Sequence, residues 1–215
     1  MALGKAQLID LYRKRAPRYD WSAQLYYLLG FREWAYRKKA VRALRLRPGD
    51  TVVEVGCGTG LNFGLLQEAV GPTGRIVGVD MTDAMLAGAR ERIEARGWQN
   101  VGLVQAEADE FPFPGRTGGI LSTFALTLVP EYDDVIRRGA DALRSEGRWV
   151  VADLKLPSEG WQRALLPVLL PLFRPFGVTL DLAGRHPWES LRRHLPRFGM
   201  ESYYFGYTYV AWGEK

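Results

Sequence analysis

The sequence predicts an α/β fold, in which a seven-stranded, mostly parallel sheet carries helices on both of its faces. From residue 51 onward, short apolar runs rich in Val and Ile alternate with segments of helical periodicity. This is the pattern of parallel strands joined by helices. At 47% hydrophobic and 25% charged residues, the 215-residue chain is able to bury a large core. An aromatic segment near the end is split by Gly206, which predicts a hairpin that adds an antiparallel strand at one edge.

The expected elements follow one another in the order that this fold requires. Strands are expected at 51–55, 75–79, 101–105, 118–123 and 147–154, with the hairpin at 202–213. Helices are expected at 5–15, 31–46, 61–70, 82–96, 131–143 and 188–195. The second of these helices ends before Pro48 and Gly49, because this pair breaks helices. Thr82 is placed to act as the N-cap of the helix that follows it.

The first 48 residues differ in charge from the rest of the chain. They hold twelve Lys and Arg residues against three acids, which gives this part a net charge of +9. Because the net charge of the whole chain is +5, the remainder carries −4. We expect 1–48 to form a helical arm and 49–215 to form one domain, with an insertion at about 157–186. A basic arm suggests an anionic partner, which is a lipid surface, a nucleic acid or an acidic substrate. The alternative is a solvated helical surface.

The composition also indicates the cellular compartment of the protein. A single cysteine, Cys57, excludes an internal disulfide and a thiolate metal cluster, which fits a reducing cytosol. No secretory leader is expected, because the start of the chain lacks an apolar region. The longest apolar stretch, 164–173, is broken by prolines and falls short of the ~20 residues of a membrane span. We therefore expect a cytoplasmic protein, with peripheral association to the inner face of the membrane as an open possibility.

A glycine-rich loop, 56–60, follows the first expected strand. In folds of this kind, ligands bind beyond the carboxyl ends of the strands. A dinucleotide loop of the form G-x-G-x-x-G needs glycine where Leu61 or Phe63 stands, and a phosphate-binding P-loop needs a lysine that is absent. The pattern E-x-G-x-G-x-G, which begins at Glu54, matches fully.

Three further segments accompany this loop. Asp80 ends the second expected strand twenty residues after Gly60, where a carboxylate is placed to accept both hydroxyls of a ribose. QAEADEFPF at 105–113 follows the third strand, and STFAL at 122–126 ends the fourth. In this order the segments resemble motifs of the class I S-adenosylmethionine (SAM) methyltransferases. The resemblance implies a Rossmann-like fold, SAM as the cofactor and no metal.

The resemblance also implies roles for particular residues. The acid of the 105–113 segment binds the adenine amino group in the family, and the next backbone N–H binds a ring nitrogen; these roles fall on Glu107 and Ala108. The predicted cofactor-binding residues are Tyr12, Tyr19, Glu54, Gly56, Cys57, Gly58, Gly60, Asn62, Asp80, Met81, Glu107, Ala108, Thr123 and Phe124. Cys57 is expected to be a small residue that the loop tolerates, not a nucleophile.

The start of the chain indicates which methyltransferases within this class the protein resembles most. Residues 11–30 resemble the entry of the quinone-biosynthesis methyltransferases and of the bacterial phosphatidylethanolamine N-methyltransferases, through Tyr12, Ala16, Tyr19 and Asp20. In those enzymes the arm folds over the cofactor, so the resemblance implies that both tyrosines reach the methionine part of SAM. The alternative is that they pack as residues of an amphipathic helix.

The methyl acceptor is inferred from the arm and from the proline-broken apolar segment, which both suit a membrane surface. The leading hypothesis is transfer to a lipid-like acceptor at a membrane, a phospholipid amine first. The alternatives are a quinone precursor or other small hydrophobic molecule, and a non-catalytic SAM-binding membrane adaptor. A nucleic-acid acceptor is disfavoured, because 122–125 lacks the D/N-P-P-Y/F motif of enzymes that methylate amino groups of bases.

Methyl transfer is an in-line displacement for which the protein mainly supplies position and a water-poor site. No single residue must therefore be catalytic. His186 and Tyr19 are candidates for moving a proton. Tyr26, Arg185 and His186 are candidates for contact with the substrate, whereas His194 is expected to lie on a basic helix surface.

Overall fold

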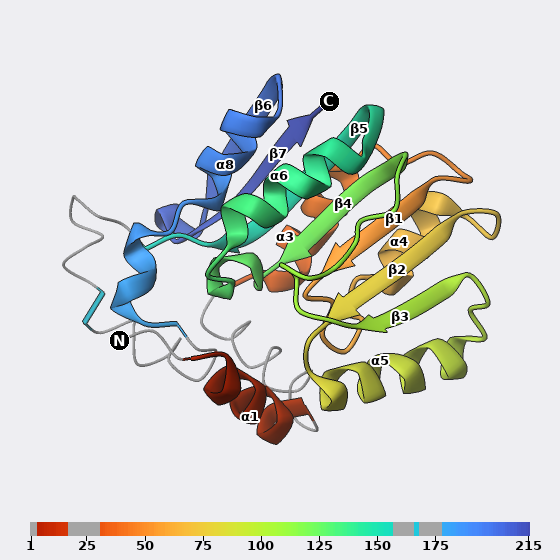
Figure 1. Ribbon diagram of the computed structural model, residues 1–215, viewed down its shortest axis with the longest axis horizontal. Coiled ribbons are helices and arrows are strands. Elements are labelled where there is room, and N and C mark those ends of the chain that lie inside the picture. The colour runs from red at the N-terminus through yellow and green to blue at the C-terminus, as the bar shows by residue number, and fades with distance from the viewer. Residues whose placement is uncertain (1–3, 17–30, 157–165, 168–177) are drawn as a thin grey trace.

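The structure is a computed structural model that describes residues 4–16, 31–156, 166–167 and 178–215. Its centre is a seven-stranded sheet in the order β3-β2-β1-β4-β5-β7-β6 (Figure 1). The strands are β1 Thr51–Val55, β2 Arg75–Asp80, β3 Val101–Gln105, β4 Thr117–Thr123, β5 Leu143–Leu154, β6 Arg197–Tyr203 and β7 Thr208–Glu214. β1 to β5 pair in parallel, and β7 runs antiparallel to both β5 and β6. The predicted fold class is confirmed, and the antiparallel strand lies one position in from the edge.

The helices of the described residues are α1 Lys5–Arg15, α3 Glu33–Ala43, α4 Phe63–Val70, α5 Asp83–Arg96, α6 Tyr132–Ala142 and α8 Pro187–His194. Short 3-10 turns are η3 Leu126–Leu128, η5 Leu180–Gly184 and η6 Tyr204–Gly206. The helix predicted to reach residue 46 ends at Ala43, because Arg45 adopts a left-handed φ of 51°. Thr82 is the N-cap of α5, although its side chain makes no capping hydrogen bond.

Two apolar layers hold the helices against the sheet. On one face, α3, α4 and α5 pack around Phe63, Leu66 and Ala40. On the other face, α6 and α8 pack around Trp149, Ile136 and Tyr209. All seven residues of β4 are buried, as expected for a central strand covered on both sides. Because β1 to β5 are parallel, their carboxyl ends meet at one edge of the sheet, and the loops that follow them gather there (Figure 1).

Several predictions fall wholly or partly outside the described residues. Of the insertion at 157–186, the structure describes residues 166–167 and 178–186. Tyr19 and Tyr26 lie outside the described ranges, so their predicted roles stay predictions, as does the domain boundary at residue 48. Within the described part of the chain, no helix has the length and apolar character to cross a membrane. Those same residues hold no group of acids, histidines or cysteine arranged for a metal ion.

Candidate active site

The glycine loop turns sharply at the carboxyl end of β1. Gly56, Gly58 and Gly60 have φ angles of 69°, 55° and 75°, which favour glycine. A Cβ on Gly56 would lie 2.4 Å from the Cβ of Ala125, and one on Gly60 would lie 2.5 Å from the ring of Phe63. A Cβ on Gly58 would meet nothing within 4 Å. Packing therefore demands glycine at the two outer positions, while the middle glycine faces open space.

That open space is a pocket along the carboxyl edge of β1, β2 and β4. The pocket is lined by Leu8, Tyr12, Arg37, Val55, Gly56, Cys57, Gly58, Thr59, Leu61, Val79, Asp80, Met81, Thr82, Met85, Ala106, Glu107, Ala108, Asp109, Thr123, Phe124, Ala125, Leu128, Val129 and Pro130. The lining thus includes most of the predicted cofactor-binding residues that the structure describes. It comes from four strand ends and from α1, α3 and α5, so distant segments of the chain build a single site.

Asp80 ends β2 and its carboxylate is fixed from both sides. Oδ2 accepts the backbone N–H of Gly58 at 2.9 Å, and Oδ1 accepts that of Thr82 at 2.8 Å. Burial raises the pKa of this carboxyl above its ordinary value, while the two backbone donors act in the opposite direction. Each carboxylate oxygen keeps a further lone-pair site. Asp80 is therefore rigidly placed in the pocket lining, with acceptor capacity for a ligand hydroxyl.

A buried polar network lies behind the glycine loop. Asn62 Nδ2 donates to Glu54 Oε1 at 2.6 Å and to Thr123 Oγ1 at 2.9 Å. Arg37 Nη1 donates to the same Thr123 hydroxyl oxygen at 2.7 Å, and Arg37 Nη2 donates to Glu33 Oε1 at 2.7 Å. The network ties α3, β1, the loop and β4 together. The network therefore fixes the position of the glycine loop.

Three predicted cofactor-binding residues, Glu54, Gly60 and Asn62, are not among the residues that line the pocket. Glu54 is 1% exposed, and burial raises the pKa of its carboxyl to about 7. Its Oε2 atom and the Oδ1 atom of Asn62 have no hydrogen-bond partner among the described residues. Protonation would give Glu54 a donor where the buried site holds two acceptors. These residues shape the loop and its electrostatics.

Arg37 was not identified by the sequence patterns, yet it lines the pocket and is only 4% exposed. In the sequence it is one of twelve cations of the basic arm. The helical period of α3 offers a weak signal, because Tyr36, Arg37, Ala40 and Val41 form its buried face. Its partner Thr123 is 86 positions away. Only the packing of α3 onto the sheet brings the guanidinium to the pocket.

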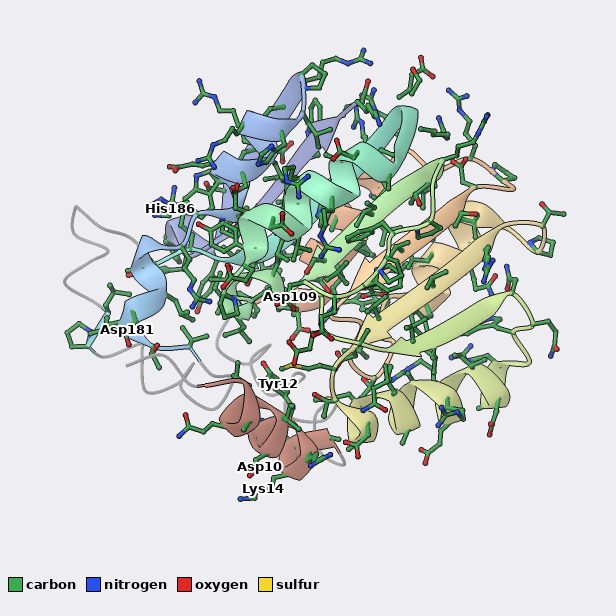
Figure 2. The ribbon with its side chains drawn as sticks, viewed as in Figure 1. Asp10, Tyr12, Lys14, Asp109, Asp181 and His186 are labelled. Carbon is green, nitrogen blue, oxygen red and sulfur yellow. The ribbon has the colours of Figure 1, made fainter. Side chains whose placement is uncertain are left out.

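α1 lies across the open side of the pocket. Tyr12 and Leu8 line it, and Figure 2 shows Tyr12 directed toward the sheet edge that carries Asp109, while Asp10 and Lys14 point away. Arg13 donates to both carboxylate oxygens of Asp83 on α5, through Nε at 2.8 Å and Nη2 at 3.2 Å. Tyr12 therefore belongs to the pocket lining, and its predicted contact with SAM stays a prediction.

The wall that follows β4 has an unusual backbone. Phe124 adopts a φ of 56° and donates its N–H to the Ala152 carbonyl at 2.8 Å. Further on, the backbone of Thr127 is held on both sides: Asp153 Oδ2 accepts its N–H at 3.0 Å, and Arg185 Nη1 donates to its carbonyl at 2.9 Å. Burial raises the pKa of Asp153 to about 6. These bonds set the position of the apolar wall residues 128–130.

The substrate candidates of the sequence lie away from the pocket lining. Arg185 contacts the wall through Thr127, as described above. The backbone N–H of His186 donates to the Tyr132 hydroxyl at 3.3 Å, and its ring packs on Trp188 with centroids 4.7 Å apart. Figure 2 places His186 toward α8, apart from Tyr12 and Asp109. His194 Nε2 lies 3.1 Å from Asp133, on the α6–α8 surface. Neither histidine is among the residues that line the pocket.

Comparison with known proteins agrees with this geometry. Residues 52–147 match the model of a family described as "Methyltransferase domain". Over 172 residues, the chain is 28% identical to a demethylmenaquinone methyltransferase of Listeria welshimeri, a match that covers 77% of this chain and 72% of the relative. A protein of the same name from Bacillus cytotoxicus is 30% identical over 151 residues, which are 69% of this chain and 62% of that protein.

Solved structures show the same fold. A SAM-dependent methyltransferase from Aquifex aeolicus superimposes with a TM-score of 0.61 at 20% identity, over 83% of this chain and 88% of that one. A phosphoethanolamine N-methyltransferase 2 from Haemonchus contortus, in complex with S-adenosyl-L-methionine, gives a TM-score of 0.60 at 16% identity, over 79% of this chain and 38% of that one. At these identities the likeness concerns the fold.

Proposed function

Since this chain is a class I SAM-dependent methyltransferase, we propose that its methyl acceptor is a demethylated quinone or a closely related hydrophobic ring. The observation that carries the proposal is the similarity to proteins named demethylmenaquinone methyltransferase, which extends over 77% of this chain. The sequence favoured a phospholipid amine, with a quinone precursor as its alternative. The relatives favour that alternative.

The pocket suits SAM by the chemistry of its residues. When bound, SAM supplies a methyl group on a positively charged sulfur. Asp80 offers acceptors to ribose hydroxyls, and the open side of Gly58 leaves room for a ligand against the backbone. Glu107 and the N–H of Ala108 are the predicted adenine contacts, and both residues line the pocket. The carboxyl oxygens of Asp80, held beside the loop by the N–H groups of Gly58 and Thr82, are acceptors that suit a cationic ligand.

Arg37 and Tyr12 complete the cofactor site at the side of the pocket nearest α1 and α3. The guanidinium of Arg37 is always charged and is held in place by Glu33 and Thr123. A fixed cation of this kind suits the carboxylate of the methionine part of SAM. Arg37 thus takes the anionic end of the cofactor in this proposal, a role that the sequence did not assign.

The apolar wall supports a hydrophobic acceptor. Phe124, Leu128 and Val129 line the pocket beyond β4. Behind them, Leu128 packs with a small apolar cluster around Val178 and Leu182. Such a wall excludes water and places a flat ring by contact, with little need for polar groups. Methyl transfer requires the acceptor to approach along the line of the breaking bond. The role of the protein is therefore to bind and orient the acceptor and to exclude water.

A direct test offers the purified protein radiolabelled SAM with either of two acceptors. One is a short-tailed quinone that lacks a ring methyl group, assayed in its oxidised and in its reduced form; the other is dispersed phosphatidylethanolamine. We expect label in the quinone product, identified by mass spectrometry. Label in the phospholipid alone would refute the proposal. SAM binding without transfer to any acceptor, including a total lipid extract, would favour a non-catalytic adaptor.

A further inference from the structure

A bulky aromatic residue stands out at the tip of the C-terminal hairpin. Phe205 is 72% exposed, and its φ is 57°, in the left-handed region that bulky residues seldom adopt. Backbone strain of this kind persists where the surrounding structure enforces it, and it is typical of functional segments. Trp34 at the start of α3 is also exposed, at 42%. A fold that buries most of its large apolar residues thus presents two of them near its basic helix.

We propose that the surface formed by Trp34, Lys38, Lys39 and Phe205, which we name the aromatic-basic surface, docks onto an anionic lipid bilayer. Its parts are connected by contacts. Lys38 Nζ lies 5.8 Å from the centroid of the Trp34 ring. Lys39 Nζ lies 4.9 Å from the ring of Tyr203, which precedes the hairpin tip. α3 and the hairpin therefore present cations and aromatic rings together, the composition of proteins that lie at a membrane interface.

The charge of α3 supports a lipid surface of opposite sign. Its solvent side carries the exposed cations Lys38, Lys39 and Arg42, and the exposed Arg32 is its N-cap residue. The acid of this helix, Glu33, faces inward and is paired with Arg37 at 2.7 Å. The exposed side of α3 is thus strongly positive. Clusters of Lys and Arg bind the negative surface of bilayers that contain anionic lipids.

The aromatic-basic surface is also linked to the active site. A run of ring contacts leads from the pocket wall to the hairpin tip: Phe124 to Phe31 at 5.8 Å, Phe31 to Tyr204 at 5.4 Å, and Tyr204 to Phe205 at 5.9 Å. The hairpin tip is thus connected, through three ring contacts, to the Phe124 wall of the pocket. The purpose of docking rests on the proposed function: a bilayer on this side of the molecule would supply an apolar acceptor to that wall with little exposure to water.

This assignment narrows the basic arm of residues 1–48, which the sequence suggested for a membrane surface, to α3 and adds the hairpin tip. Arg13, in the first part of the arm, is instead engaged with Asp83 of α5. A nucleic acid would also be drawn to the cations of α3. It would not explain why a strained hairpin tip holds an apolar ring in water. The combination of a charged helix and an exposed Phe favours a lipid surface.

The test is co-sedimentation of the full chain with vesicles of phosphatidylcholine alone or mixed with phosphatidylglycerol, without SAM or acceptor. We expect binding to the anionic vesicles that weakens as salt is raised. Trp34→Ser with Phe205→Ser should lower the partition coefficient about tenfold or more, and Lys38→Gln with Lys39→Gln should do the same. Matched controls are Val104→Ser, an exposed apolar residue of β3, and Arg75→Gln, an exposed cation at the start of β2. Both controls should bind like the parent chain.

Several results would overturn the proposal. Absence of binding to anionic vesicles would do so, as would full binding by both double variants. A change of the oligomeric state in the aromatic double variant, with vesicle binding unaltered, would assign the surface to a second copy of the chain. Loss of RNA or DNA binding by the lysine variant alone would assign it to nucleic acid. Methyl transfer to a short-tailed acceptor in solution should survive in every variant, so a failure of the proposed function is read separately from a failure of docking.

Discussion

Replacement of Asp80 by asparagine tests the cofactor site most directly. Both carboxylate oxygens of Asp80 accept backbone N–H groups, from Gly58 at 2.9 Å and from Thr82 at 2.8 Å. An asparagine must turn its NH₂ group toward one of these donors, which leaves that N–H without an acceptor. A buried donor without a partner costs about 1–3 kcal/mol, and this cost falls on the glycine loop or on the start of α5, according to which N–H loses its acceptor.

The variant also loses its charge. A hydrogen bond to a charged group contributes about 1.5–3 kcal/mol, and asparagine keeps one acceptor oxygen, so the loss of one such bond to the ribose would weaken SAM binding by about 1.5–3 kcal/mol. This corresponds to a dissociation constant raised about 10- to 100-fold. Isothermal titration calorimetry with SAM measures it, and circular dichroism confirms that the variant is folded. Asp141→Asn, which removes an exposed carboxylate from α6, serves as the charge control.

The same titration with S-adenosylhomocysteine separates the possible roles of Asp80. This product shares the ribose of SAM and lacks the positive charge on sulfur. If Asp80 binds the ribose, the Asp80→Asn variant loses affinity for both molecules to the same degree. A selective loss for SAM would show that the carboxylate acts on the sulfonium. An affinity within threefold of the parent chain, in a folded variant, would refute the assignment of this pocket to the cofactor.

Three further changes test the loop and the α1 contact. The pKa of Glu54 rises on folding from 4.5 to about 7, so the native state holds this proton more tightly than the unfolded state. The free energy of unfolding should therefore fall by up to about 3 kcal/mol as the pH rises from 4.5 through 7. In the Glu54→Gln variant, the decrease of Tm between about pH 5 and pH 8 should be smaller than in the parent chain. An equal decrease in both proteins would contradict the assignment of this pH dependence to Glu54. Gly56→Ala brings a Cβ to 2.4 Å from Ala125, so it should destabilise the fold by about 1–3 kcal/mol in chemical denaturation, whereas Gly58→Ala should lower stability less and mainly weaken SAM binding. Arg13→Gln should weaken SAM binding a few-fold at low salt, with the difference vanishing at high salt; an equal loss at both salt concentrations would show that this ion pair is not the cause.

The sequence predicted most accurately the bounds of those elements that are flanked by helix- or strand-breaking residues. α1, β1 and β3 have the predicted bounds, since each is a periodic or β-branched run between breakers. Elements whose ends depend on a partner strand were placed less well. β5 begins at Leu143, four residues before the prediction, because Leu143 pairs with Thr117 of β4. β6 begins at Arg197, well before the aromatic pattern, because it pairs along its whole length with β7.

Some residues of the candidate site were likewise predictable from local sequence, and others were not. The glycine loop, Asp80 and the segment around Glu107 were found from short motifs, and the structure brings them to one pocket. His186 was considered for its chemistry alone, and its backbone and ring contact Tyr132 and Trp188 away from the pocket lining. Arg37 was missed, because a cation within a basic helix resembles its neighbours until the helix is packed on the sheet.

By itself, the sequence determined the order of strands and helices, the glycine positions of the loop and the acids at the strand ends. These follow from forces between near neighbours: left-handed backbone angles at Gly56 and Gly60, and the apolar periodicity of each element. Only the tertiary structure decided which residues meet. The bond from Arg37 to Thr123, the ion pair from Arg13 to Asp83 and the ring contact of Phe31 with Tyr204 each join segments far apart in the chain. Such contacts arise when apolar faces are buried together, and no local pattern records which surfaces that burial brings side by side.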